Sequence, residues 1–155
     1  MFNLLVIIVL VGLDQGFKYL ATNYLVDIVP VTIIPKIFGF NYVHNYGAGF
    51  SILSGKTDFL IYFTAIALLA IAFCIFTKKF ETLSEELCFV LILAGGIGNL
   101  IDRVVNGYVV DYIEFLFIEF PVFNFADILI CVGVGLFALE TIKTEFFSKN
   151  KGEKQ

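Results

Sequence analysis

The sequence predicts an all-α integral membrane protein with four transmembrane helices, joined on one side of the membrane by short strands and an interfacial helix. Of its 155 residues, 59% are hydrophobic, which exceeds the roughly 45–50% apolar usage of soluble domains. The mean hydropathy is +0.93. A bilayer core of ~30 Å needs about 20 mainly apolar residues per helix, and the chain contains four such runs. We therefore expect a single membrane domain over residues 1–155.

The first run covers residues 2–21 and superficially looks like a secretory signal. It has no basic n-region, however, and it carries Asp14 and Lys18 where a signal peptide is uniformly apolar. We therefore expect a retained helix. The other spans are expected at residues 59–76, 87–105 and 125–146.

Lysines mark the cytoplasmic side of the predicted bundle. Lys78 and Lys79 lie between the second and third spans, and further lysines lie at or beyond the fourth span. By the positive-inside rule both places face the cytoplasm, so both termini are expected there. The connections 22–58 and 106–124 then form the outer face.

The two outer connections differ in pattern. Residues 22–58 are rich in β-branched and aromatic residues interrupted by proline and glycine, which predicts short strands on the membrane surface. In residues 106–124, Asn106 and Gly107 mark a turn. Aromatic and apolar residues then recur with glutamates between them, which predicts a short helix lying in the interface.

Composition argues against several other classes of protein. The net charge is only −4 and the basic residues are scattered, so nothing indicates nucleic-acid binding. Cys74, Cys88 and Cys131 lie in apolar runs without metal-binding or redox spacing, and we expect them to be small buried hydrophobic residues. No metal or other cofactor is expected.

Charged residues inside the spans are the informative ones, because each costs about 2.5–3.5 kcal/mol at the bilayer centre. Asp14 and Lys18 are spaced i,i+4 and can neutralise each other on one helix face, either as a structural ion pair or as part of a site. Near the outer end of the third span, Asn99, Asp102 and Arg103 form either a helix-end polar network or a binding site for an anionic headgroup.

Two carboxylates, Asp111 and Asp127, converge on the outer side. Taken alone, Asn124 and Asp127 fit an N-cap and a first-turn acid at the start of the fourth helix. A functional site is favoured by the other polar residues expected at the same level, namely Asn45, Asn99, Asp102 and Arg103.

Paired carboxylates suit one kind of chemistry. Two such groups in one site cannot both ionise cheaply, so the pair is expected to hold a single proton near neutrality. The charged member can act as general base on a water while the protonated member donates to a scissile carbonyl, which hydrolyses a peptide without metal. The chain offers no GxSxG or HExxH motif, and its single histidine, His44, is interpreted as a structural or surface residue.

Two other classes of function remain as alternatives. Intramembrane acids and lysines also build ion pathways, so a small ion- or proton-conducting membrane protein is one alternative, and a non-catalytic scaffold is another. A conducting protein would distribute its carboxylates through the membrane depth. Here they are expected to cluster near one surface.

Five segments give the chain a family resemblance. In order they are LDQGFKYL, NYVHNYGAGFSIL, GGIGNLIDR, GYVVDYIEF and FNFADILICVG. Together they resemble the lipoprotein signal peptidases, the type II signal peptidases of bacteria, over almost the whole chain. The sequence departs from the usual family motifs at Gly49, where alanine is frequent in the family, and at Tyr112, where phenylalanine is commoner.

The resemblance implies a four-helix aspartyl endopeptidase of the bacterial cytoplasmic membrane, with a small extracytoplasmic β-cradle and an interfacial helix. It implies removal of the signal peptide from diacylglyceryl-modified prolipoproteins, just before the lipidated cysteine. It further implies contact with membrane lipids and inhibition by globomycin-type cyclic peptides. Gly95, Gly96 and Gly98 are expected to allow close approach of a helix or of the substrate backbone.

Carried over by motif position, the catalytic pair is Asp111 and Asp127. Asp102 is the main rival for a catalytic part, and we assign it instead to organising the site together with Arg103. The full set of residues expected to organise the site or bind substrate is Asp14, Lys18, Asn45, Gly47, Asn99, Asp102, Arg103 and Asn124.

Overall fold

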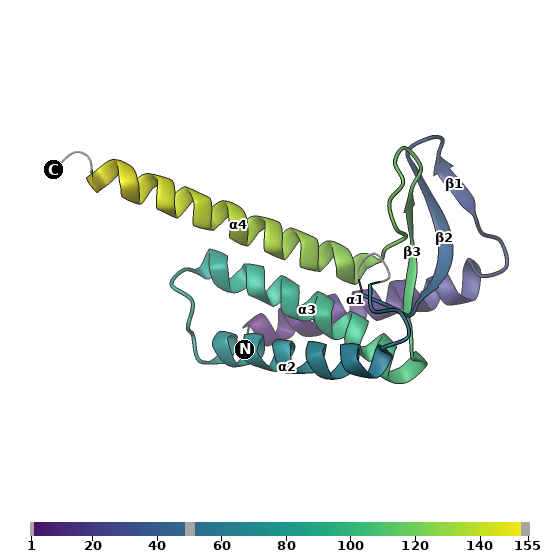
Figure 1. Ribbon diagram of the computed structural model, residues 1–155, viewed down its shortest axis with the longest axis horizontal. Helices are drawn as coiled ribbons and strands as arrows, with labels where there is room; N and C mark the ends of the chain where they lie inside the picture. Colours follow the sequence, from purple (N-terminus) through teal and green to yellow (C-terminus); the bar gives the residue numbers. More distant parts are fainter. Residues whose placement is uncertain (1, 49–51, 153–155) are drawn as a thin grey trace.

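The computed structural model describes residues 2–48 and 52–152 of the chain, so the departure at Gly49 lies outside the described residues. The elements in order are α1 (Phe2–Tyr24), β1 (Val31–Ile34), β2 (Phe38–Asn45), α2 (Thr57–Phe76), α3 (Leu83–Asn106), β3 (Val109–Phe115) and α4 (Phe125–Gly152). The helices lie side by side, and the three strands stand at one end of them (Figure 1).

All four helices are long and apolar enough to cross a membrane. Helix α3 begins at Leu83, before the expected span, because Thr82 and Glu85 form a capping box that satisfies its first backbone N–H groups. It ends where Gly107 adopts φ 80°, a left-handed conformation that favours glycine. The predicted turn at Asn106 and Gly107 is thereby confirmed.

Helix α3 is the centre of the bundle, and three of its glycines each face a different helix. A Cβ atom on Gly95 would overlap the carbonyl oxygen of Ala126 in α4, and one on Gly96 would overlap the side chain of Leu68 in α2. One on Gly98 would overlap the carboxylate of Asp14 in α1. The expected close approach at these glycines is therefore an approach of the other three helices.

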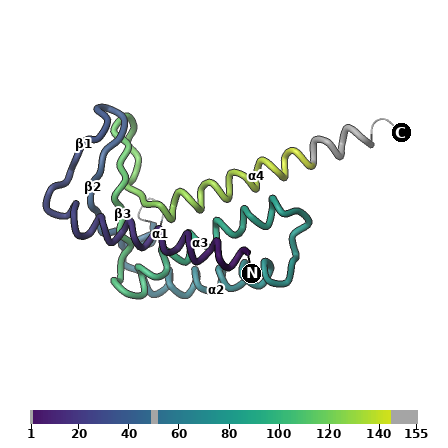
Figure 2. Tube along the Cα trace, turned by 180° about the vertical axis from the view of Figure 1, so that it is seen from behind, coloured from purple at the N-terminus to yellow at the C-terminus, as the bar shows by residue number. Residues whose placement is uncertain are grey.

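The strands form an antiparallel sheet in the order β1-β2-β3. In its register Val43 lies opposite Asp111 and Asn45 opposite Val109. The sheet lies near the beginning of α4, on the side away from the connection between α2 and α3, in both views (Figure 1, Figure 2). The strands β1 and β2 confirm the prediction of short strands between the first two spans.

The predicted interfacial helix was wrong. Residues 109–115 form β3, and the described residues 116–124 contain no helix. The segment VVDYIEF is rich in β-branched and aromatic residues, and its first four residues are buried. Pairing with β2 satisfies the backbone N–H and C=O groups of these buried residues. A helix lying in the interface would leave this segment nearer the surface.

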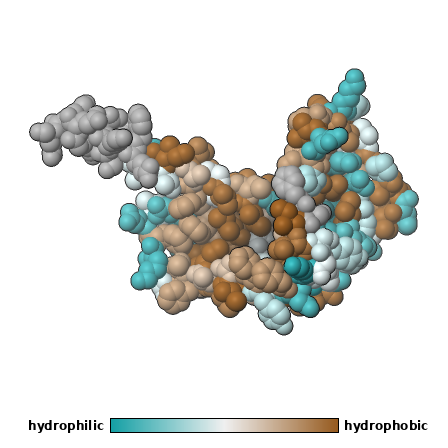
Figure 3. Space-filling model, viewed as in Figure 1, coloured by the Kyte–Doolittle hydropathy of each residue, from teal (hydrophilic) through white to brown (hydrophobic). Residues whose placement is uncertain are grey.

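Large apolar side chains cover much of the outside of the helices. Leu5, Ile66 and Leu139, for example, are each about two-thirds exposed in the isolated chain, with exposed fractions of 61%, 69% and 65%. Figure 3 shows apolar residues over the middle of the bundle and hydrophilic residues gathered towards its ends. This distribution matches a bundle whose solvent is lipid.

Candidate active site

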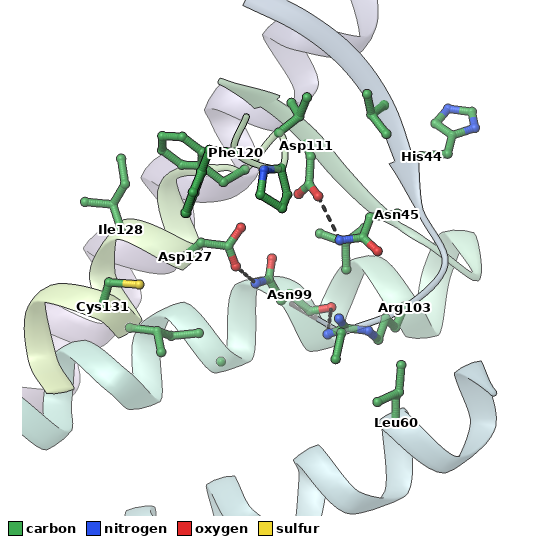
Figure 4. A pocket seen from close by; sticks show the side chains of 18 of the residues that line it. His44, Asn45, Leu60, Asn99, Arg103, Asp111, Phe120, Asp127, Ile128 and Cys131 are labelled. Atoms are coloured by element: carbon green, nitrogen blue, oxygen red, sulfur yellow. Dashed lines mark hydrogen bonds between the residues drawn. The ribbon is translucent and has the colours of Figure 1, made fainter. Parts of the chain in front are cut away.

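A cavity of about 780 Å³ lies where the sheet meets the bundle. Its lining comes from β2, β3, α2, α3 and α4, and Asp111 and Asp127 both face it (Figure 4). The polar residues Asn45, Asn99 and Arg103 also line it. The structure thus brings the two predicted carboxylates and three of the predicted supporting residues to one cavity.

Asp111 projects from β3 and is only 1% exposed. Its Oδ2 accepts a hydrogen bond from Asn45 Nδ2 at 2.9 Å, and its Oδ1 accepts one from Asn124 Nδ2 at 2.6 Å. Burial, with a smaller contribution from the nearby charge of Asp127, raises the pKa of Asp111 to about 7 against the lowering effect of the two amide donors. This carboxyl group therefore changes its protonation state near neutral pH.

Asp127 is the third residue of α4. Its Oδ1 accepts from Asn99 Nδ2 at 2.8 Å, and its Oδ2 accepts from the backbone N–H of Asn124 at 3.1 Å. In return the backbone N–H of Asp127 donates to Asn124 Oδ1 at 3.0 Å. Asn124 and Asp127 thus form a reciprocal cap at the start of α4, and the same amide also reaches Asp111.

The turn that follows β2 and the side chain of Arg103 form another wall of the cavity. Asn45 Oδ1 accepts from the backbone N–H of Gly47 at 2.9 Å, which directs the amide nitrogen of Asn45 towards Asp111. Arg103 Nη2 donates to the carbonyl oxygen of Gly47 at 2.8 Å, and its Nη1 donates to that of Asn99 at 3.5 Å. Arg103 therefore braces the turn that carries Asn45.

Asp14, Lys18 and Asp102 form a buried cluster beside the cavity. Lys18 Nζ lies 2.9 Å from Asp14 Oδ2 and 3.1 Å from Asp102 Oδ2, and it donates to Asn99 Oδ1 at 2.9 Å. The predicted Asp14–Lys18 pair is thus part of a larger network. Asp102 is not among the residues that line the cavity, and its ionic partner is Lys18, so its organising partner differs from the expected Arg103.

Sequence reasoning missed one member of this cluster and misjudged a cysteine. Gln15 Nε2 donates to Asp102 Oδ1 at 3.0 Å and to the carbonyl oxygen of Gly98 at 3.1 Å. Its position beside Asp14 in a membrane helix was the available signal. Cys131 is exposed and lines the cavity, so the expectation that it is buried was wrong; it lies one turn after Asp127 on the same helix face.

The rest of the cavity wall is mainly apolar. Leu60 of α2 lies across the cavity from Ile128 and Cys131 of α4 (Figure 4), and Phe115, Phe120 and Phe123 also line it. Within residues 2–48 and 52–152, no three His, Cys, Asp or Glu side chains are grouped so that they could hold a metal ion. The arrangement combines two coupled carboxylates with an apolar approach, which suits hydrolysis of a bond in an apolar segment.

Comparison with known proteins identifies the family. The signal peptidase (SPase) II family matches residues 6–143. The chain belongs to the signal peptidase II family. The lipoprotein signal peptidase of Clostridioides difficile is 42% identical over 136 residues, covering 86% of this chain and 89% of that protein. That of Streptococcus thermophilus is 40% identical over 140 residues, covering 90% of this chain and 91% of the relative.

Solved structures agree with signal peptidase II membership. A bacterial membrane enzyme determined by the in meso method at 2.3 Å resolution superposes with a TM-score of 0.83 and 33% identity, covering 91% of this chain and 87% of the other. A second, at 1.9 Å, gives a TM-score of 0.76 and 31% identity, covering 91% and 92%. This protein is accordingly a multi-pass bacterial membrane peptidase, and the ion-conducting alternative is not favoured.

Proposed function

We propose that this protein is an aspartyl endopeptidase that removes the signal peptide from diacylglyceryl-modified prolipoproteins, cutting on the N-terminal side of the lipidated cysteine. Asp111 and Asp127 are its catalytic pair. The observation that carries the proposal is that both carboxylates face one cavity and both accept a hydrogen bond from the buried residue Asn124. Its side-chain amide donates to Asp111, and its backbone N–H donates to Asp127.

The chemistry follows from the shared proton. The ionised member of the pair takes a proton from a water molecule, which attacks the scissile carbonyl carbon as the protonated member donates to the carbonyl oxygen. The resulting tetrahedral intermediate then collapses, and the leaving amine takes a proton from the dyad. No covalent intermediate with the protein is required.

Substrate selection rests on the apolar walls of the cavity. The cavity lies between α2 and α4, with Leu60 on one side and Ile128 on the other, so an apolar signal peptide can approach from the bilayer. The diacylglyceryl chains lie against apolar side chains among membrane lipids. A globomycin-type cyclic peptide would inhibit by occupying the same cavity.

The supporting residues divide by what they contact. Asn45, Asn99 and Asn124 bind the two carboxylates directly, and Gly47 and Arg103 hold the turn that carries Asn45. Lys18 forms ion pairs with both Asp14 and Asp102 behind the site. We assign the last group to organisation of the site.

The proposed topology places the active site near the outer leaflet, with both termini in the cytoplasm. Helix α1 begins at the end of the bundle away from the sheet, and the connection between α2 and α3, which carries Lys78 and Lys79, lies at the same end (Figure 1). By the positive-inside rule that side is cytoplasmic. The sheet and the cavity then lie on the outer side, within one membrane domain.

The test uses purified protein in detergent with a diacylglyceryl-modified prolipoprotein and its unmodified precursor. We expect cleavage of the lipidated form alone, with product masses that place the cut just before the modified cysteine. Treatment with a chelator should leave the rate unchanged. Intact lipidated substrate after incubation with folded enzyme would contradict the proposal.

A further inference from the structure

We infer that Lys18 is a positioning residue that fixes the position of the two catalytic aspartates relative to each other. It acts through two carboxylates, each of which accepts a hydrogen bond from the backbone N–H of the residue before one of these aspartates. Asp14 does this for Asp127, and Asp102 does it for Asp111. This inference rests on the proposed dyad and deepens it, because it assigns a specific task to the buried cluster.

The first contact fixes the beginning of α4. Asp14 Oδ1 accepts a hydrogen bond from the backbone N–H of Ala126 at 3.0 Å, and Ala126 directly precedes Asp127. An N–H in the first turn of a helix has no partner within that helix, so a carboxylate from α1 can take it. The negative charge also lies at the favourable end of the α4 dipole. Asp14 thereby ties the start of α4 to α1.

The second contact repeats this arrangement on the sheet. Asp102 Oδ2 accepts from the backbone N–H of Val110 at 2.9 Å, and Val110 directly precedes Asp111. Asp102 lies on α3, so this bond ties β3 to the central helix. The two catalytic aspartates are thus each held from the preceding residue by a buried carboxylate.

Lys18 joins the two contacts. Its Nζ lies 2.9 Å from Asp14 Oδ2 and 3.1 Å from Asp102 Oδ2, and it is only 3% exposed. A lysine has three N–H donors, and the third contacts Asn99 Oδ1 at 2.9 Å. Asn99 in turn binds Asp127. One ammonium group therefore fixes the spacing between α4 and β3 at the catalytic pair.

Removing Lys18 leaves Asp14 and Asp102 buried without their cation, and both carboxylates must then move or take up protons. Either change loosens Ala126 and Val110, and with them the catalytic pair. Lys18 is not among the residues that line the cavity, so substrate contacts stay intact. We therefore expect a loss in kcat with little change in KM.

Gly98 offers a test that leaves every charge in place. A Cβ atom there would overlap Asp14 Oδ2, so Gly98→Ala displaces this carboxylate without touching Lys18 or the dyad. Gly12→Ala is the matched control, because nothing lies within 4 Å of its added Cβ. Lys18→Met forms a second pair with Lys79→Met, where the native lysine is exposed.

The experiment measures kcat and KM for the lipidated substrate, per mole of monodisperse folded enzyme. We expect Gly98→Ala and Lys18→Met to lower kcat by about 10²-fold, the cost of a misplacement of about 1 Å at a reacting centre. KM should match the controls. The double variant should lose little beyond Lys18→Met alone, because both changes act through Asp14.

If folded Gly98→Ala enzyme matches Gly12→Ala in kcat, or loses activity only through KM, the positioning role is refuted. Gly98→Ala decides the question by itself should Lys18→Met fail to fold. Asp111→Asn and Asp127→Asn are measured in the same series. Full activity in either of these variants would instead refute the dyad, so failure of the inference is distinguishable from failure of the proposed function.

Discussion

Asn124 donates to Asp111 Oδ1 at 2.6 Å while its own Oδ1 accepts from the backbone N–H of Asp127 at 3.0 Å. One buried side chain therefore contacts both members of the proposed dyad and also caps α4. The structural role of Asn124 as an N-cap and its functional role at the dyad therefore arise from the same geometry.

This dual role predicts that two substitutions separate stability from activity. Asn124→Ala loses both the cap and the bond to Asp111, so it should lower the free energy of unfolding by about 1 kcal/mol. Cleavage should slow by about 10²-fold as Asp111 loses its position. Asn124→Ser keeps a capping oxygen but no donor that reaches Asp111.

Thermal unfolding and cleavage rates of both variants check this. The serine variant should recover most of the lost stability and little of the activity. Recovery of full activity by serine would show that the bond from Asn124 to Asp111 is dispensable.

The raised pKa of Asp111 predicts two effects of pH. Burial, together with a smaller contribution from the charge of Asp127, raises this pKa from 3.8 to about 7. The folded state therefore binds a proton more tightly than the unfolded chain. The resulting stabilisation is complete below the unfolded pKa and is lost as pH rises through about 7.

Unfolding temperatures in detergent should accordingly fall between pH 5 and pH 8 more steeply for the wild type than for Asp111→Asn. Cleavage should also decline as pH rises past about 7, because the dyad then loses its shared proton. An identical stability profile for both proteins would argue against a titrating Asp111.

Much of this arrangement was predictable from the sequence, because lipid imposes simple demands. Four apolar runs of sufficient length predict four helices, and the cost of intramembrane charge made Asp14, Lys18 and Asp102 informative before their contacts were known. The glycines in the middle of α3 likewise indicated close packing.

Other features depend on contacts between distant segments. A short helix was expected from the recurrence of Tyr112, Phe115, Leu116 and Phe120, and this apolar spacing does not by itself distinguish a helix from a strand. Pairing of β3 with β2 and burial on both faces decide for a strand. The contacts of Asp14 with Ala126 and of Asp102 with Val110 involve backbone groups, which have no sequence signature.

The packing of α3 against α4 predicts a sharp difference between two glycines. Alanine at Gly95 would overlap the backbone oxygen of Ala126, which cannot move aside as a flexible side chain can. We expect Gly95→Ala to lower the free energy of unfolding by about 1–3 kcal/mol. Gly135→Ala, with nothing within 4 Å of its Cβ, is the control. Equal thermal unfolding temperatures for the two variants would contradict this packing.

The position of Cys131 predicts inhibition by thiol reagents. Its side chain lines the cavity one turn after Asp127, whereas Cys88 is buried. A bulky methanethiosulfonate reagent should label Cys131 and block cleavage by filling the cavity. The Cys131→Ser enzyme retains Cys74 and Cys88 and should keep its activity after the same treatment. Comparable inhibition of this variant would place the reactive thiol elsewhere.

The central claim is that Asp111 and Asp127 together perform the hydrolysis. Single-turnover cleavage of the diacylglyceryl-modified prolipoprotein by Asp111→Asn and by Asp127→Asn tests it most directly, with Asp27→Asn as a control at an exposed position. We predict that each dyad variant folds, binds substrate and forms no product, while the control cleaves at the wild-type rate. Product formation at the wild-type rate by either dyad variant would contradict the account.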